Sequence, residues 1–205
     1  MGGVWRVGER CWLAQQWFVY LSGVTAEPRK QLSRFEVPKD ARAFTFSTYR
    51  RARVLDREEI AQTLLACVRR ASETYAWSVL AFVVMPDHVH VLAFPRSDAP
   101  DASRLLFAIK RPASFKIKML LSEKDIECLT TPQGRFRLWQ AGGGHDRNLR
   151  RTDSLISMIE YIHANPARAG LCARPEEWRW SSWRQWHGDE REAHEWEPRV
   201  DRSRV

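Results

Sequence analysis

Hydrophobic and polar residues are distributed along the chain in patterns that predict four strands. Residues 43–49 and 136–139 alternate between apolar and polar side chains, which is typical of strands with one buried face. Residues 77–85 are apolar almost throughout, which indicates a strand that is covered on both faces. A Pro-Asp turn follows, and residues 88–94 then form the hairpin partner of that strand.

Between these strands, two segments carry apolar residues at helical spacing. Residues 57–73 form the first predicted helix, and Asp56 is its candidate N-cap. Residues 103–121 form the second, but Pro112 lies inside it. Because proline removes a helical hydrogen bond and clashes with the preceding turn, we expect a kink or a break into two helices there.

A further helix is predicted in the last third of the chain. Thr152-Asp153-Ser154 can cap its N-terminus, and Leu155, Ile159 and Ile162 form its buried stripe. We expect this helix to end at Asn165-Pro166, because the residue before a proline avoids helical backbone angles.

The order of these elements is strand, helix, strand, strand, helix, strand, and then the last helix. This order predicts an α+β fold: a ferredoxin-like antiparallel sheet with helices packed on one face, plus a C-terminal helix. We expect a Trp- and Arg-rich extension at residues 1–36, the folded domain at residues 37–187, and a polar tail at residues 188–205.

Charge and cysteine content narrow the class of partner and the compartment. The formal net charge of +8 at pH 7 favours a polyanion as partner, nucleic acid first. The four cysteines are scattered without a CxxC pair, so neither a zinc finger nor a disulfide scaffold is indicated, and a reducing cytosol is the expected compartment. No apolar run is long enough to span a bilayer, and no phosphate-binding glycine motif occurs.

The strongest candidate for chemistry is the pair His88 and His90. Side chains alternate across a strand, so both imidazoles point to one face, roughly 6–7 Å apart, and both can reach one metal ion. A His-x-His pair also arises by chance at the start of many strands. Tyr161 and Asn165 are four residues apart and share one face of the last helix. A tyrosine at such a position is usually a packing residue.

Four stretches, taken together and in order, resemble one known family. They are Met85-Pro86-Asp87-His88-Val89-His90, Leu138-Trp139-Gln140, Tyr161-Ile162-His163-Ala164-Asn165-Pro166-Ala167-Arg168-Ala169-Gly170-Leu171, and Trp178-Arg179-Trp180-Ser181-Ser182. These stretches are similar to the signatures of the single-tyrosine HUH transposases, specifically the REP-associated tyrosine transposases. The likeness extends from about residue 43 to residue 183.

This resemblance implies a metal-dependent enzyme that nicks single-stranded DNA and transfers strands at hairpin or palindromic repeats. It implies that His88 and His90 are metal ligands, that Asn165 is a third, polar ligand, and that Tyr161 is the nucleophile that forms a 5′-phosphotyrosine intermediate. Mg²⁺ or Mn²⁺ suits such a mixed nitrogen and oxygen site at a phosphodiester. Asp87 departs from the family, in which asparagine is common at this position.

The implied partner is single-stranded or hairpin DNA, bound by a monomer or a homodimer in the bacterial cytosol or nucleoid. Basic residues that are candidates for phosphate contacts are Lys110, Arg111, Lys116, Arg147, Arg150, Arg151 and Arg168. Two other functions remain open: a domesticated protein that binds hairpin DNA without cleaving it, and a metal-dependent phosphoesterase that uses water as the nucleophile.

Overall fold

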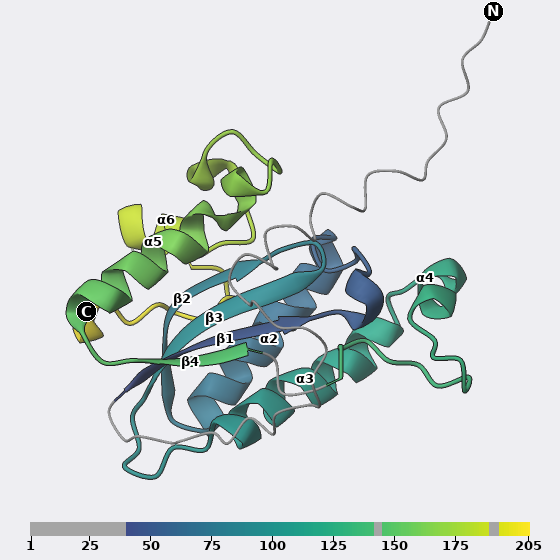
Figure 1. Cartoon of the computed structure of the whole chain (residues 1–205), viewed down its shortest axis with the longest axis horizontal. Coiled ribbons are helices and arrows are strands. Elements are labelled where there is room, and N and C mark those ends of the chain that lie inside the picture. The colour runs from purple at the N-terminus through teal and green to yellow at the C-terminus, as the bar shows by residue number, and fades with distance from the viewer. Residues whose placement is uncertain (1–39, 142–144, 189–192) are drawn as a thin grey trace, which may run out of the picture. The chain divides into compact units, whose positions relative to one another are not determined.

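A four-stranded antiparallel sheet organises the part of the chain that the structure describes (Figure 1). The structure is a computed structural model, and it describes residues 40–141, 145–188 and 193–205. The strands are β1 (Ala41–Ser47), β2 (Trp77–Val84), β3 (His88–Pro95) and β4 (His145–Leu149), and their order in the sheet is β2-β3-β1-β4. The N-terminal extension expected at residues 1–36 lies outside the described residues.

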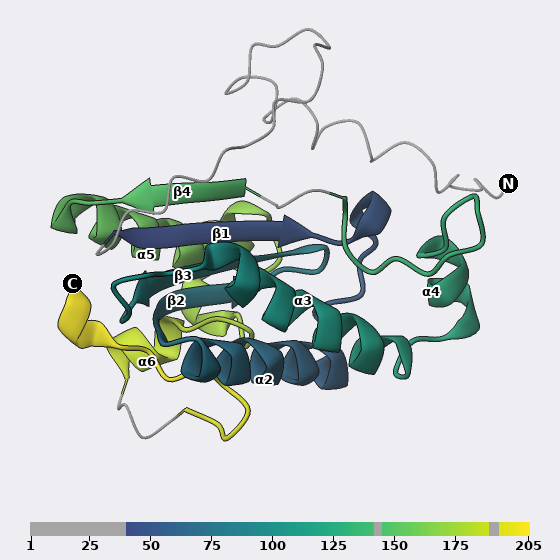
Figure 2. The same ribbon diagram turned by 90° about the horizontal axis from the view of Figure 1, so that it is seen from below.

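Helices cover both faces of this sheet. The helices α2 (Glu58–Thr74) and α3 (Ala102–Lys118) pack on one face, over a core that includes Val89 and Val91 of β3 (Figure 2). The helix α5 (Thr152–Arg168) packs on the other face through Leu155, Ile159 and Ile162, the stripe that the sequence predicts. The remaining helical segments are α4 (Glu123–Cys128), α6 (Trp183–His187) and the short 3-10 helices η1 (Tyr49–Arg51), η2 (Pro175–Glu177) and η4 (Arg202–Arg204).

The apolar character of β2 follows from this double cover. Trp77, Val79 and Phe82 belong to the core under α2 and α3, whereas Leu80 and Val83 belong to the core under α5. All eight residues of the strand are buried. The predicted α+β fold with a ferredoxin-like sheet is confirmed. The helices predicted on one face are α2 and α3, and the predicted C-terminal helix is α5.

The prediction of a strand at residues 136–139 is wrong. Phe136 and Trp139 form only isolated bridges, with Thr130 and Thr48. Their segment alternates because Phe136 packs against the core and Leu138 is buried in it, while Arg137 between them is exposed, which does not require a place in the sheet. The fourth strand is instead β4, a mainly polar edge strand that pairs with β1 through its backbone. Such a strand has no hydrophobic alternation that would reveal it.

Neither proline ends or interrupts its helix. Pro112 lies inside α3, which continues from Ala102 to Lys118, so the predicted break is absent. The buried stripe of α3 extends on both sides of the proline and holds the two halves in one helix against α2 and the sheet. Likewise, α5 continues through Pro166, and the predicted end at Asn165 is wrong by one turn. The ring of Pro166 is buried, and near the end of a helix it removes a single hydrogen bond.

The N-cap of α2 also differs from the prediction. Arg57 is the N-cap, and its side chain accepts no capping hydrogen bond, so Asp56 stands one residue too early to cap the helix. Arg57 instead forms two hydrogen bonds with Asp125 of α4, at 2.5 and 2.8 Å, which connect the two helices.

The described part of the segment expected as a polar tail lies against the sheet. Val200 forms a parallel bridge with Val79 of β2, and the backbone N–H of Asp201 donates to the Val79 carbonyl oxygen at 2.8 Å. The hydroxyl of Ser78 donates to the Asp201 carboxylate, also at 2.8 Å. No helix within the described part of the chain has the length and apolar character needed to span a bilayer.

Candidate active site

The two histidines at the start of β3 face the helix that carries Tyr161. Residues 88, 90, 92 and 94 share one face of β3, and Leu92 on that face is buried in the core under α5. The ring centroids of His88 and His90 are 4.9 Å apart. Nδ1 of His88 lies 2.7 Å from the Asp87 carboxylate, and Nδ1 of His90 lies 2.8 Å from the Thr45 hydroxyl. The two Nε2 atoms are therefore the nitrogens that can bind a metal ion.

The protonation states at this site suit metal binding. Burial, reinforced by the neighbouring His88, lowers the pKa of His90 to about 3, so its ring is neutral at physiological pH and has a lone pair to donate. Burial by itself would raise the pKa of Asp87. The hydrogen bond from His88 and the charges of His88 and Arg51 outweigh that effect, and the pKa of Asp87 lies below its usual value.

Tyr161 lies beside this pair. Its side chain is 42% exposed, and its ring centroid is 6.0 Å from that of His90, with the two rings nearly perpendicular. Two features bring them together: β3 presents the histidines to the face that α5 covers, and the buried stripe of α5 leaves Tyr161 at its border. Residues 71 positions apart in the chain thus form one site.

Asn165 lies one turn beyond Tyr161 on α5. Its side-chain nitrogen donates to the backbone carbonyl oxygen of Tyr161 at 3.0 Å. The donor end of the amide is thus used within the helix, and its oxygen is the end that a metal ion would require.

The side chains present fit a divalent metal ion. Two imidazoles and an amide oxygen form an incomplete donor set that leaves positions for phosphate oxygens. The contact between His88 Nδ1 and Asp87 is of the kind that would orient a ligating histidine and fix its tautomer. No cluster of three or more His, Cys, Asp or Glu side chains suited to a metal occurs among the described residues. Among the described residues, a third protein ligand would therefore have to be of another type, such as the amide of Asn165.

The predicted phosphate-binding residues do not form one cluster. Arg168 lies over the ring of Tyr161, with its guanidinium carbon 5.3 Å from the ring centroid. Lys110, Arg111 and Lys116 are on α3, which packs on the face of the sheet opposite α5. Arg147 is on β4, and Arg150 and Arg151 follow it, each paired with a carboxylate: Asp40 at 2.8 Å and Asp153 at 3.6 Å.

Arg51 also belongs to this site, although it is not among the site residues that the sequence predicts. Its guanidinium lies 3.4 Å from the Asp87 carboxylate and donates to the Ser47 hydroxyl at 2.9 Å. Arg50 and Arg51 have φ angles of 53° and 57°, which are unfavourable for residues with a side chain. The only hint in the sequence is the run of arginines directly after the first strand.

A buried histidine fixes α5 to the sheet. His163 Nε2 lies 2.9 Å from the hydroxyl oxygen of Ser182, and that oxygen accepts a hydrogen bond from the Phe82 backbone N–H of β2, also at 2.9 Å. Burial is the main cause that lowers the pKa of His163 to about 4, with a smaller contribution from His187. The ring is therefore neutral in the folded protein, and its protonation favours unfolding.

This histidine should make stability fall between pH 6.5 and pH 4. Because the unfolded chain binds the proton near pH 6.5, folding stability is complete above that pH and decreases as the pH falls towards 4. We expect His163→Gln to remove about 2 kcal/mol of the stability lost between pH 7.5 and pH 5. Urea unfolding of both proteins at the two pH values measures this difference. His90 contributes equally to both proteins, so an unchanged pH dependence in the variant would contradict the prediction.

A comparison with protein families matches one part of the chain. Residues 42–142 match the family model described as IS200-like transposase, so the folded domain contains a stretch similar to that family, which includes both histidines and α3. A comparison with curated proteins gave no match.

Two solved structures are similar to this chain. One is a REP-associated tyrosine transposase bound to a REP hairpin, with 20% identity, a TM-score of 0.61, and coverage of 78% of this chain and 84% of that chain. Another, from Deinococcus radiodurans, is described as an inferred transposase, with 20% identity, a TM-score of 0.43, and coverage of 66% of this chain and 97% of that chain. The resemblance to REP-associated tyrosine transposases that the sequence motifs indicate is thus confirmed: the domain is IS200-like, and its fold is shared with the REP-associated enzyme.

Proposed function

We propose that this protein nicks and rejoins single-stranded DNA at hairpin repeats, through a 5′-phosphotyrosine intermediate on Tyr161. The observation that carries the proposal is the position of Tyr161 next to His90, on the face of the sheet to which both histidines point. The IS200-like domain supports the reaction class, and the hairpin bound to the similar structure supports the kind of DNA.

The reaction exchanges one phosphate ester for another. The phenolic oxygen of Tyr161 attacks the scissile phosphorus and loses its proton, while the bond from phosphorus to the 3′ oxygen breaks and that oxygen becomes a 3′-hydroxyl. Because the ester to tyrosine retains the bond energy, a 3′-hydroxyl from another strand can reverse the step without ATP. Mg²⁺ or Mn²⁺, held by His88, His90 and Asn165, would polarise the phosphate and neutralise developing charge.

The residues around the tyrosine have supporting roles in this proposal. Arg168, above the phenol ring, is placed to contact the phosphate that Tyr161 attacks. Asp87 holds His88 by hydrogen bond, and Arg51 is paired with Asp87 at the exposed side of the site. The remaining basic residues, on α3 and around β4, would contact DNA further from the cleaved bond.

Covalent capture tests the proposal directly. The full chain is incubated with Mg²⁺ or Mn²⁺ and hairpin oligonucleotides taken from the flanks of its own coding region, and a denaturing gel is scored for a covalent band. A 5′-phosphotyrosine predicts that a 3′-end label migrates with the protein, whereas a 5′-end label is released on a fragment with a 3′-hydroxyl. Tight hairpin binding with no nick would support the domesticated binding protein instead.

A further inference from the structure

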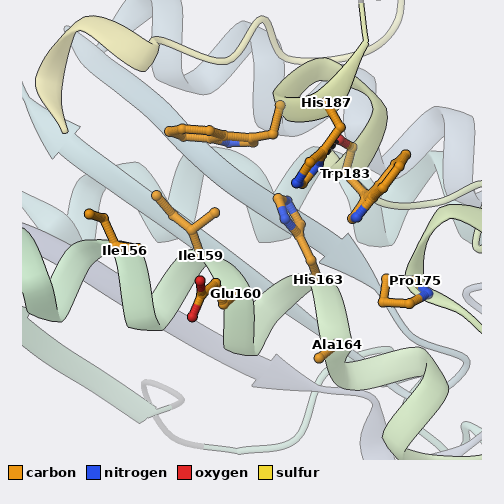
Figure 3. A pocket seen from close by; sticks show the side chains of 9 residues that line it. Ile156, Ile159, Glu160, His163, Ala164, Pro175, Trp183 and His187 are labelled. Carbon is orange, nitrogen blue, oxygen red and sulfur yellow. Dashed lines mark hydrogen bonds between the residues drawn. The ribbon is translucent and has the colours of Figure 1, made fainter.

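A pocket lies on the side of α5 that faces away from Tyr161. It has a volume of about 330 Å³ and is formed by α5, η2 and α6 (Figure 3). Its lining residues are Ile156, Ile159, Glu160, His163, Ala164, Pro175, Trp183, Trp186 and His187. None of these residues belongs to the metal and tyrosine site described above.

The walls of this pocket are apolar and partly flat. Ile156 and Ile159 line it from α5, and the indole rings of Trp183 and Trp186 line it from α6. Both indoles have fixed positions: Trp186 Nε1 donates to the Leu80 carbonyl oxygen at 2.8 Å, and Trp183 stacks on His187 with ring centroids 4.2 Å apart. A planar ring that enters the pocket would therefore meet preformed aromatic and aliphatic surfaces.

The polar groups of the pocket are acceptors of hydrogen bonds. Figure 3 shows His163 and His187 directed towards one another at one end of the pocket, and Glu160 beside Ile159 on the helix. Nδ1 of His187 lies 3.0 Å from the Trp183 carbonyl oxygen. Because a carbonyl can only accept, Nδ1 carries the proton, and Nε2 is left as an acceptor in the neutral ring. The Glu160 carboxylate is a second acceptor.

These features indicate which kind of ligand the pocket can bind. The lining contains a carboxylate but no lysine or arginine, which disfavours a phosphate or another anion. Flat apolar walls with acceptors nearby suit a planar, uncharged ligand that carries N–H donors. An unstacked nucleobase has these properties, and proteins that bind single strands commonly hold bases against aromatic side chains.

The pocket and the proposed cleavage site lie on the same helix, α5. Glu160 and Ala164, which line the pocket, precede and follow Tyr161 within one turn of the same helix. A helix with its side chains is about 10–12 Å across, so a strand whose phosphate lies at Tyr161 reaches the pocket by crossing α5.

We propose that this pocket binds one unstacked base of the DNA strand that Tyr161 cleaves, close to the cleaved phosphate. The inference rests on the proposed function for the identity of the strand, but base binding can be tested without cleavage. Guanine, cytosine and adenine each present an amino group that can donate to the carboxylate of Glu160, whereas thymine has one imide N–H and no amino group. We therefore expect each of these three bases to be preferred over thymine.

Titration of the full chain with single nucleotides tests the pocket by itself. The probes are the 5′-monophosphates of deoxyguanosine, deoxycytidine, deoxyadenosine and thymidine, with 2-deoxyribose 5-phosphate as the probe that lacks a base. We expect the guanine, cytosine and adenine nucleotides to shift the NMR signals of the Trp183 and Trp186 indoles and the Ile159 methyl groups, with affinity roughly fivefold or more above that of thymidine monophosphate. Glu160→Ala should remove this preference, because alanine has no hydrogen-bond acceptor, and Glu59→Ala, a surface change on α2, should keep it.

The outcomes separate this inference from the proposed function. If no nucleotide shifts the pocket signals, or if the sugar phosphate shifts them equally, base binding is overturned even when the chain forms covalent adducts. If the nucleotides shift the signals but no adduct forms, the pocket stands and the cleavage proposal fails. In a series of cleavable oligonucleotides, an abasic site is placed at successive positions of the strand. It should slow adduct formation at one position, and Ile156→Asp should abolish that position dependence.

Discussion

Replacement of Tyr161 by phenylalanine is expected to abolish the covalent protein–DNA adduct while hairpin binding stays close to that of the unmodified protein. The change removes the hydroxyl that would attack phosphorus, but it keeps the ring that packs beside His90 and below Arg168. Because the side chain is 42% exposed, the loss of its hydroxyl should alter the free energy of unfolding by no more than about 0.5 kcal/mol. A denaturing gel measures the adduct, and a native gel measures binding.

The matched control is Tyr75→Phe, which removes a hydroxyl at the end of α2, away from the histidines. Its adduct yield should equal that of the unmodified protein. An adduct formed by Tyr161→Phe would show that another side chain is the nucleophile. Strand cleavage that needs the histidines but is unaffected by Tyr161→Phe would show that water is the nucleophile, as in a phosphoesterase.

The parts of the site that depend on local periodicity could be predicted from the sequence. Alternation along residues 88–94 placed both histidines on one face and Val89 and Val91 on the other, and the structure has this arrangement. The continuous apolar character of residues 77–85 likewise indicated cover on both faces, which β2 has. In both cases, the polarity of the residues along the strand reflects which faces of the strand are covered.

The parts that depend on distant contacts could not be predicted in this way. β4 is held by backbone pairing with β1, which has no signature in its polar side chains. Arg51 contacts Asp87 from a segment in which Arg50 and Arg51 both adopt left-handed backbone angles. An arginine in the sequence does not predict such angles. The pocket beside α5 lies between α5 and α6, and the intervening residues give no indication that Ile156 and Trp186 line one cavity. The end of α5 was predicted too early because a proline near a helix end destabilises the helix less than a proline in its interior, so α5 continues past Pro166.

Loss of either imidazole of the proposed metal site should be nearly as damaging as loss of the tyrosine hydroxyl. We expect His88→Ala and His90→Ala each to lower the rate of adduct formation by at least about 100-fold, since loss of a partner that merely orients a metal ligand already costs 10–100-fold. The effect of Asp87→Asn should be much smaller. An asparagine side chain keeps an oxygen that can accept from Nδ1 of His88, so the ring stays oriented while the negative charge is lost.

Binding of Mn²⁺ gives a readout of these changes that does not depend on cleavage. In the unmodified protein, Mn²⁺ should broaden the NMR signals of His88, His90 and Tyr161, because paramagnetic relaxation acts at short range and the three rings lie within one site. Either alanine variant should require much more Mn²⁺ for the same broadening of Tyr161, and His194→Ala, which changes a histidine stacked on Trp196, should behave as the unmodified protein does. Equal broadening in all four proteins would show that the imidazole pair does not hold the ion, whatever the effect of the substitutions on the rate.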